Sequence, residues 1–159
     1  MSIAKQIARQ FRELHFGPNL TAATFKDTLA DISWQQATTQ VYTLNTIAKL
    51  TFHINYYTSE VLKVLEGGPL LARDKYSYDL PPINGPEDWD KLCAKALADG
   101  AAFADKLAEM SDEQLFETFV DEKYGNYYRN IHGIIEHSNY HLGQIALIKK
   151  ILIAQEVAS

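Results

Sequence analysis

The chain has 159 residues, of which 47% are hydrophobic and 22% charged, a balance typical of one soluble globular domain over residues 1–159 and unlike a disordered chain. The net charge of −5 argues against a nucleic-acid partner, because nucleic-acid binders usually carry a basic surplus, and no apolar run predicts a signal peptide or a membrane partner. The single cysteine, Cys93, excludes an internal disulfide and fits a reducing compartment, so we expect a cytoplasmic protein.

The N-terminal region predicts one helix and two shorter helical segments. Apolar residues recur with helical spacing over residues 2–15, at Ile3, Ile7, Phe11 and Leu14. Residues 17–19, Gly-Pro-Asn, interrupt this pattern. A second segment is expected from Leu20 to about Ile32, with Thr21 as its N-cap. Ser33 and Gln36 then have the spacing of a capping box, which predicts a short helical turn.

Three long helices follow. The first is expected from Thr43 to about Glu66, and the second from Pro86 to about Met110, since proline suits the first position of a helix. The last is expected over about residues 127–155. Residues 67–86 contain four prolines without periodicity and predict a long crossover loop. Residues 111–114 form another capping box, and the aromatic stretch at 116–126 favours no particular structure.

These elements predict an all-α protein. Three long amphipathic helices and the N-terminal segments are typical of a four-helix bundle. The long loop between the second and third main helices indicates at least one crossover, in place of strict up-and-down order.

Two histidines near the C-terminus carry the clearest chemical signal. His137 and His141 stand four residues apart in the last predicted helix. This spacing places two side chains on one face, about 5–6 Å apart at Cβ. Two imidazoles so placed can bind one metal ion at about 2.0–2.1 Å each. The competing interpretation is that both are ordinary core or surface histidines.

A third histidine strengthens the metal hypothesis. His53 lies in the middle of the first long helix, among aliphatic and aromatic residues. Inward residues on two packed helices of a bundle can converge on a metal. Three neutral imidazoles would leave positions of a divalent ion open to water or substrate, as in catalytic rather than closed structural sites. Imidazole alone does not select among zinc, nickel, iron and copper.

Other metal patterns are absent from the sequence. It contains neither the His-Glu-x-x-His motif of zinc proteases nor the Glu-x-x-His motif of ferritin-like di-iron bundles. Cys93 has no cysteine or histidine at ligand spacing, so we interpret it as a small core residue. His15 lies at a predicted helix end, and His132 precedes His137 by five residues, which turns it away; neither is assigned to the metal.

The segment at residues 136–145, Glu-His-x-x-Tyr-His-x-Gly-Gln-Ile, resembles the DinB/YfiT-like superfamily of metal-dependent enzymes, as does a histidine within an earlier helix. Residues 13–21 and 25–29 look like the opening of one DinB branch, Gly-Pro-x-Trp-x-Gly-x-x-Leu-x-x-x-Leu. Residues 65–67 and 110–115 also match in placement. The likeness covers most of the chain.

This resemblance implies a four-helix bundle with non-alternating connectivity and a metal site at His53, His137 and His141. The metals associated with such sites are zinc, nickel, iron and manganese, and homodimers are frequent. Some members are thiol S-transferases that use bacillithiol, mycothiol or glutathione; one is a maleylpyruvate isomerase; many have no known activity. Leu20 replaces the usual tryptophan, and Ala22-Ala23 lacks the later glycine, which implies a different small-molecule substrate.

We therefore expect a metal-dependent transferase or hydrolase-like enzyme, in which the ion lowers the pKa of a thiol or water. The rival hypothesis is a non-catalytic protein, a metal-binding stress-response or dimerisation module. Tyr57 and Glu60 follow His53 by four and seven residues, on its face, and Gln144 follows His137 by seven. Each is a candidate for supporting a ligand or moving a proton. The competing readings are packing for Tyr57, solvation for Glu60 and a contact with a neighbouring helix for Gln144.

Overall fold

The structure is a computed structural model that describes residues 2–158. Over this range it contains no β-strand, only an isolated bridge between Thr118 and Asn126, so the all-α prediction is confirmed. The helices are α1 (Ile3–Phe16), α2 (Phe25–Ala30), α3 (Trp34–Thr38), α4 (Ile47–Leu65), α5 (Pro86–Glu109) and α6 (Tyr127–Val157). Three short 3-10 turns join them: η1 (Asp74–Tyr76), η2 (Gln114–Phe116) and η3 (Glu122–Tyr124). Four of these helices, α1, α4, α5 and α6, pack together.

The start of α2 differs from the prediction. Thr24, not Thr21, is the N-cap, and its side chain accepts a hydrogen bond from the backbone N–H of Asp27. Thr21 instead donates its hydroxyl proton to Asn19 Oδ1, inside a turn in which Ala22 has a φ of 53°. The local hydrogen bonds of Asn19 therefore hold the chain in a turn and delay the helix.

The helix α4 also begins later than the predicted Thr43, because Thr46 caps it by accepting from Lys49 N–H. Pro86 opens α5 as expected. The capping box at Ser33 and Gln36 is present, with both reciprocal hydrogen bonds. The predicted box at residues 111–114 makes the same pair of bonds and precedes η2.

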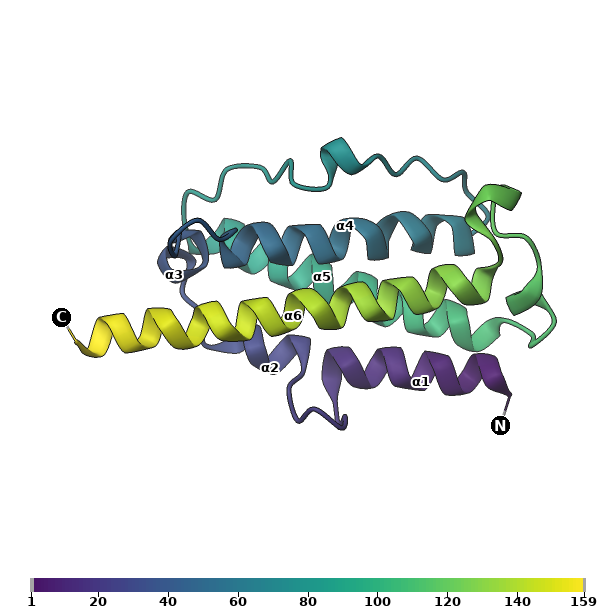
Figure 1. The fold of residues 1–159 in the computed structure, drawn as a ribbon, viewed down its shortest axis with the longest axis horizontal. Coiled ribbons are helices and arrows are strands. Elements are labelled where there is room, and N and C mark those ends of the chain that lie inside the picture. Colours follow the sequence, from purple (N-terminus) through teal and green to yellow (C-terminus); the bar gives the residue numbers. More distant parts are fainter. Residues whose placement is uncertain (1, 159) are drawn as a thin grey trace.

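The direction of the helices explains the long loop. In Figure 1, α4 and α5 run in one direction along the bundle, and α1 and α6 run in the other. Because α4 and α5 are parallel neighbours, residues 66–85 have to return along the whole length of the bundle before α5 begins. We call residues 66–85 the crossover. It covers the outer side of α4 and carries η1.

The core consists of two apolar clusters stacked along the bundle. One joins α2, α3, the first halves of α4 and α5 and the second half of α6, and includes Ile54 and Leu142. The other joins α1, the ends of α4 and α5 and the first half of α6, and includes Val61 and Ile135. His53 precedes Ile54 on α4, while residues 137–141 fall between Ile135 and Leu142 on α6. Buried polar side chains lie where the two clusters meet, and we call them the polar layer: His53, Asn55 and Thr58 on α4, and Ser138 and His141 on α6.

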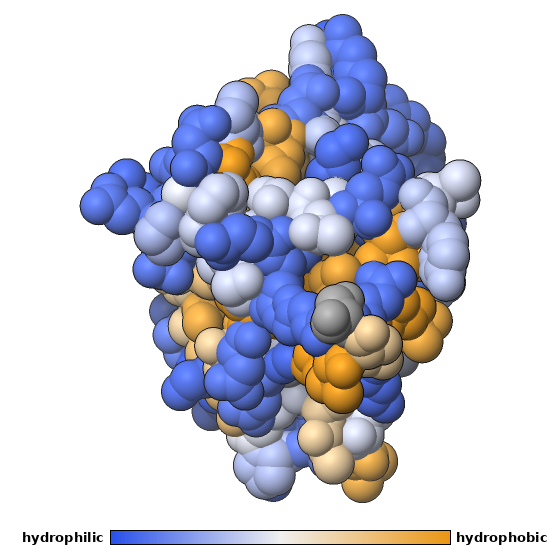
Figure 2. Space-filling model, turned by 90° about the vertical axis from the view of Figure 1, so that its left-hand side faces the viewer, coloured by the Kyte–Doolittle hydropathy of each residue, from blue (hydrophilic) through white to orange (hydrophobic). Residues whose placement is uncertain are grey.

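Helix α6 extends beyond its neighbours at the C-terminal end (Figure 1). Its last turns expose Ile153 and Val157, and Figure 2, which looks onto this end, shows hydrophobic residues next to hydrophilic ones there. Within residues 2–158, no helix combines the length and apolarity needed to span a bilayer.

Candidate metal centre

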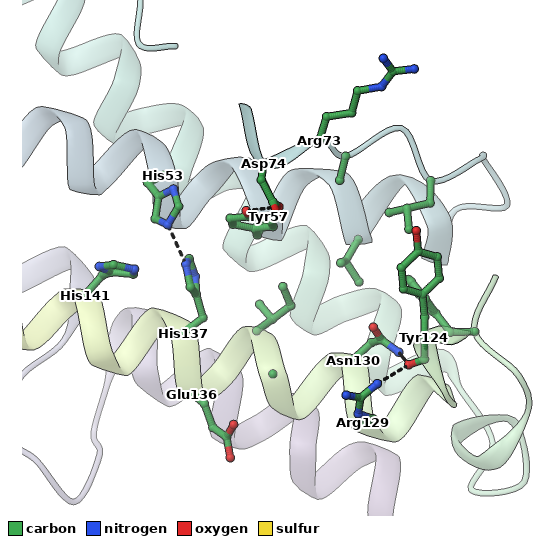
Figure 3. Close-up of a pocket in the computed structure, with 16 residues that line it drawn as sticks. His53, Tyr57, Arg73, Asp74, Tyr124, Arg129, Asn130, Glu136, His137 and His141 are labelled. Carbon is green, nitrogen blue, oxygen red and sulfur yellow. Dashed lines mark hydrogen bonds between the residues drawn. The ribbon is translucent and has the colours of Figure 1, made fainter. Parts of the chain in front are cut away.

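Three imidazoles meet in the polar layer between the clusters. His53 comes from α4, and His137 and His141 come from α6. Their ring centroids lie 4.5–4.8 Å apart, and the Nε2 atoms of His53 and His137 are separated by 2.9 Å (Figure 3). Together they form a group that could hold one metal ion, since one ring nitrogen from each lies within 4.8 Å of the others. The i, i+4 spacing on α6 thus brings its pair to the histidine on α4.

Hydrogen bonds set the orientation of two of the rings. His53 Nδ1–H donates to the backbone carbonyl of Ser77 on the crossover, at 3.1 Å. His141 Nδ1–H donates to the side-chain oxygen of Gln144, at 2.6 Å. A proton on Nδ1 of a neutral imidazole leaves a lone pair on Nε2. Both rings therefore present Nε2 as an acceptor nitrogen, the form that binds a metal, and that of His53 faces Nε2 of His137.

His137 is the least satisfied of the three. Its Nδ1 is buried and has no hydrogen-bond partner among the described residues. Burial, with the nearby His141 and His53, lowers the pKa of His137 to about 4, and burial also lowers the pKa of His53. These imidazoles are therefore neutral at physiological pH, which keeps their lone pairs available.

The group fits a metal ion chemically. Imidazole nitrogens bind divalent ions at about 2.0–2.1 Å, so two donors of one ion stand within about 4 Å of each other. The 2.9 Å between the Nε2 atoms of His53 and His137 meets this limit, whereas the three ring nitrogens together lie within 4.8 Å, so the rings have to draw slightly closer to share one ion. Two neutral rings with lone pairs this close repel each other unless a proton or a cation lies between them. The described residues add no fourth His, Cys, Asp or Glu to the group.

Tyrosines surround the histidines. Tyr78, from the crossover, stacks on His53 with centroids 3.9 Å apart, and Tyr140 lies edge-on to His141. Tyr57 packs against both His53 and His137, and its hydroxyl donates to Asp74 Oδ1 at 2.8 Å. Burial and the Asp74 carboxylate raise the pKa of Tyr57, so its phenol stays protonated.

A pocket of about 910 Å³ opens next to this group (Figure 3). His53, His137 and His141 lie at one end, and Tyr124, Arg129 and Asn130 lie at the other. Between them the Tyr57–Asp74 pair faces the space, whereas Arg73 and Glu136 point away from it. Its volume is in the range of small-molecule sites.

The structure distinguishes among the residues that the sequence suggested as supports for a metal ligand or for proton transfer. Tyr57 and Gln144 contact the histidine group, Gln144 through His141. Glu60 does not line this pocket. It is only 8% exposed, which also contradicts a solvated position, and pairs with Lys63.

The remaining candidates lie elsewhere. His15 is buried against α5, and His132 packs on Tyr128. Cys93 is half-buried against the first cluster, where burial raises its thiol pKa to about 12. Sequence reasoning missed Asp74 and Ser77, because the crossover has no periodicity to indicate which residues face inward.

Comparisons with known proteins agree with this architecture. The model of the DinB superfamily matches residues 18–145. A solved structure described as that of a conserved protein from Enterococcus faecalis superposes with a TM-score of 0.68, covering 97% of this chain and 99% of its own. The two sequences are 17% identical, so this likeness speaks for the fold alone. No curated protein matches significantly in sequence.

Proposed function

Because the chain belongs to the DinB superfamily, we propose that it is a metal-dependent enzyme that acts on a small molecule, with His53, His137 and His141 as its metal ligands. The observation that supports this most directly is the convergence of three imidazoles beside a pocket of about 910 Å³. The reaction we propose is transfer of a low-molecular-weight thiol to an electrophile, or a related hydrolysis.

A divalent ion such as zinc, nickel, iron or manganese would supply Lewis acidity, which lowers the pKa of a thiol or of water to near neutrality. The protein's own groups orient the reactants. The Ser77 carbonyl and Gln144 fix the tautomers of His53 and His141. The Tyr57 hydroxyl donates its proton to Asp74, so its oxygen is a hydrogen-bond acceptor placed between the histidines and the rest of the pocket.

The donor set favours an open site over a structural one. Structural zinc sites usually have four protein ligands, whereas catalytic sites have three and keep a position for water or substrate. The group within residues 2–158 has three, and it faces a pocket instead of packed side chains. The rival function, a non-catalytic metal-binding module, predicts the same ligands but no turnover.

Element analysis of protein purified without a His tag tests the first step. We expect about one divalent ion per chain in the natural protein and only traces in His137→Ala. His132→Ala is the matched control, because His132 lies on the same helix outside the group and should leave the metal content unchanged. A natural protein without metal, even after incubation with each ion, would contradict the proposal.

Thiol-transfer assays test the second step. The metal-loaded protein is incubated with bacillithiol, mycothiol or glutathione and a generic electrophile, and thioether formation is measured. We expect turnover that is lost in His137→Ala and retained in His132→Ala. Stoichiometric metal with no turnover of any thiol, and no hydrolysis of ester or amide substrates, would favour the non-catalytic module.

A further inference from the structure

The end of the pocket that lies farthest from the histidines contains an arginine. Arg129 lines it, eight residues before His137 on α6. Its Nη1 donates to the backbone carbonyl of Tyr124 at 3.0 Å (Figure 3). The ion pairs among residues 2–158 do not include Arg129. Because a guanidinium has five N–H donors, this single side-chain bond leaves Nε and Nη2 open to a ligand.

The loop before α6 holds this guanidinium in place. Asn130 Nδ2 donates to the same Tyr124 carbonyl, at 2.9 Å, so two side chains of α6 converge on one oxygen (Figure 3). Gly125 follows the η3 turn with a φ of 75°. A Cβ at Gly125 would lie only 3.1 Å from Arg129 Cδ, so the glycine lets the arginine pack closely against the loop. The orientation of the guanidinium is therefore set by the fold.

The charges around this end favour an anion. Arg129 lies in the first turn of α6, a helix of 31 residues, and the N-terminus of a helix carries a partial positive charge. Two carboxylates also line the pocket, but Glu136 points away from the space, and Asp74 accepts the Tyr57 proton closer to the histidines. Arg73, the other arginine of the lining, also points away. A ligand at this end therefore meets the charge of Arg129.

The two ends of the pocket require an elongated ligand. The eight residues from Arg129 to His137 correspond to about 12 Å along the helix axis. Between these two positions α6 contributes Gly133 and Ile134 to the lining, and α4 contributes Val61 from the opposite side. A molecule that reaches from the histidines to the arginine therefore crosses a mainly apolar stretch.

We propose that Arg129 binds a carboxylate of the small molecule, and that the substrate is an elongated acid with its reacting group at the opposite end. This proposal rests on the function proposed above, because it places the reacting group, such as a thiol, at the histidines. The planar guanidinium and a carboxylate match each other through two parallel N–H···O bonds. The apolar stretch would enclose the chain that joins the two groups.

Other head groups fit Arg129 less well. An ammonium group has donors only, and the arginine repels it. A hydroxyl forms a hydrogen bond without opposite charges, which is weaker. A phosphate monoester carries about two negative charges, whereas this end offers one arginine and the Asp74 carboxylate lies in the same pocket. A single carboxylate balances the charge of Arg129.

Calorimetry with two matched thiols tests the proposal on the metal-loaded protein. Mercaptooctanoate and mercaptooctanol, each with its thiol at the end of the chain, differ only in the group that would reach Arg129. We expect the acid to bind at least about tenfold more tightly than the alcohol, as a charge-assisted hydrogen bond requires. Equal affinities of the two thiols would overturn the proposal.

Substitutions locate the carboxylate. Arg129→Gln should remove the preference for the acid and leave the affinity for the alcohol unchanged. Asn130 still bonds to the Tyr124 carbonyl in this variant, so the loop should keep its place. Arg73→Gln is the matched control, because Arg73 lines the same pocket and points away from it. A preference that survives in Arg129→Gln, or is lost in Arg73→Gln, would contradict this location.

Nuclear magnetic resonance of the metal-free protein separates this proposal from the fate of the enzyme activity. The Nε–H signal of Arg129, identified by its loss in Arg129→Gln, should shift when millimolar octanoate is added and stay in place with octanol. That shift would support the carboxylate site even in a protein that binds no metal and turns over no thiol. An unchanged signal would count against the site even in an active enzyme.

Discussion

The protein uses buried histidine in two different ways. His15, on α1, is 2% exposed and lies among aromatic rings, with Phe11 and Phe25 at centroid distances of 4.5 and 5.4 Å. Its Nδ1–H donates to the Phe11 carbonyl, and Gly100 on α5 leaves room for its ring. The three histidines of the candidate metal centre face one another and a pocket.

The comparison shows that burial alone does not identify a functional histidine. Burial lowers the pKa of His15 to about 4, and it does the same to His137. The difference lies in the surroundings of the ring nitrogens. His15 meets packed side chains, whereas His137 meets two other imidazoles across 4.5–4.7 Å.

The largest contrast is expected from paired alanine substitutions. His53→Ala should abolish stoichiometric metal binding, and with it the stabilisation of about 2.7 kcal/mol that an ion at 100 times its Kd confers. His15→Ala should keep the metal and destabilise the fold by about 3 kcal/mol, because it opens a cavity in the core. Element analysis and urea unfolding with and without metal measure both effects. Metal loss in His15→Ala would remove the distinction between the two environments.

Acid should reveal the environment of His15. Its pKa is lowered from 6.5 to about 4, so the folded protein binds this proton less readily than the unfolded chain. Neutral His15 therefore contributes about 3 kcal/mol to the free energy of unfolding. This contribution is fully present above pH 6.5 and is lost as the pH falls to about 4. His15→Leu should lose correspondingly less stability between pH 7 and pH 4 in urea unfolding. An identical pH dependence in both proteins would contradict this assignment.

Substitution of Gln144 tests how much a hydrogen bond to a metal ligand contributes to metal affinity. Gln144→Leu deletes the acceptor that holds Nδ1–H of His141. Outer partners of this kind usually contribute about 10- to 100-fold to metal affinity, and we expect a loss in that range with the fold intact. Competition with a chelator of known affinity measures it. Gln155→Leu, near the end of α6, is the control variant.

The smallest effect is expected at the contact between α1 and α5. An added Cβ at Gly100 would lie 2.4 Å from His15 Cδ2, so Gly100→Ala forces the ring to move. Overpacking costs about 1–3 kcal/mol, and the better helix propensity of alanine returns about 1 kcal/mol, which leaves a net loss of about 1 kcal/mol. Gly143→Ala, where an added Cβ meets nothing within 4 Å, should instead stabilise α6. Thermal unfolding compares the two.

Helical periodicity made much of this arrangement predictable. The four-residue spacing of His137 and His141 indicated a shared face, and the apolar residues around His53 indicated an inward position. Gln144 was singled out by its distance from His137, but it acts on His141, three residues before it. On a helix that closer spacing is the more direct signal.

Contacts made by the crossover were not predictable in the same way. Ser77 acts through its backbone carbonyl, which no side-chain pattern reveals, and Asp74 reaches Tyr57 across 17 positions of the chain. The start of α2 was misplaced for a local reason, because Thr21 and Thr24 are equally suitable caps and the bonds of Asn19 decide between them.

The division of the interior into two apolar clusters has a consequence for how the protein opens. We expect each cluster to unfold as a unit, and α4 and α6 contribute side chains to both. An ion bound between α4 and α6 at the polar layer would couple the unfolding of one cluster to that of the other. Its removal would then change how far unfolding spreads from one half to the other, so amide exchange in α4 and α6 would report on a site that the amides themselves do not touch.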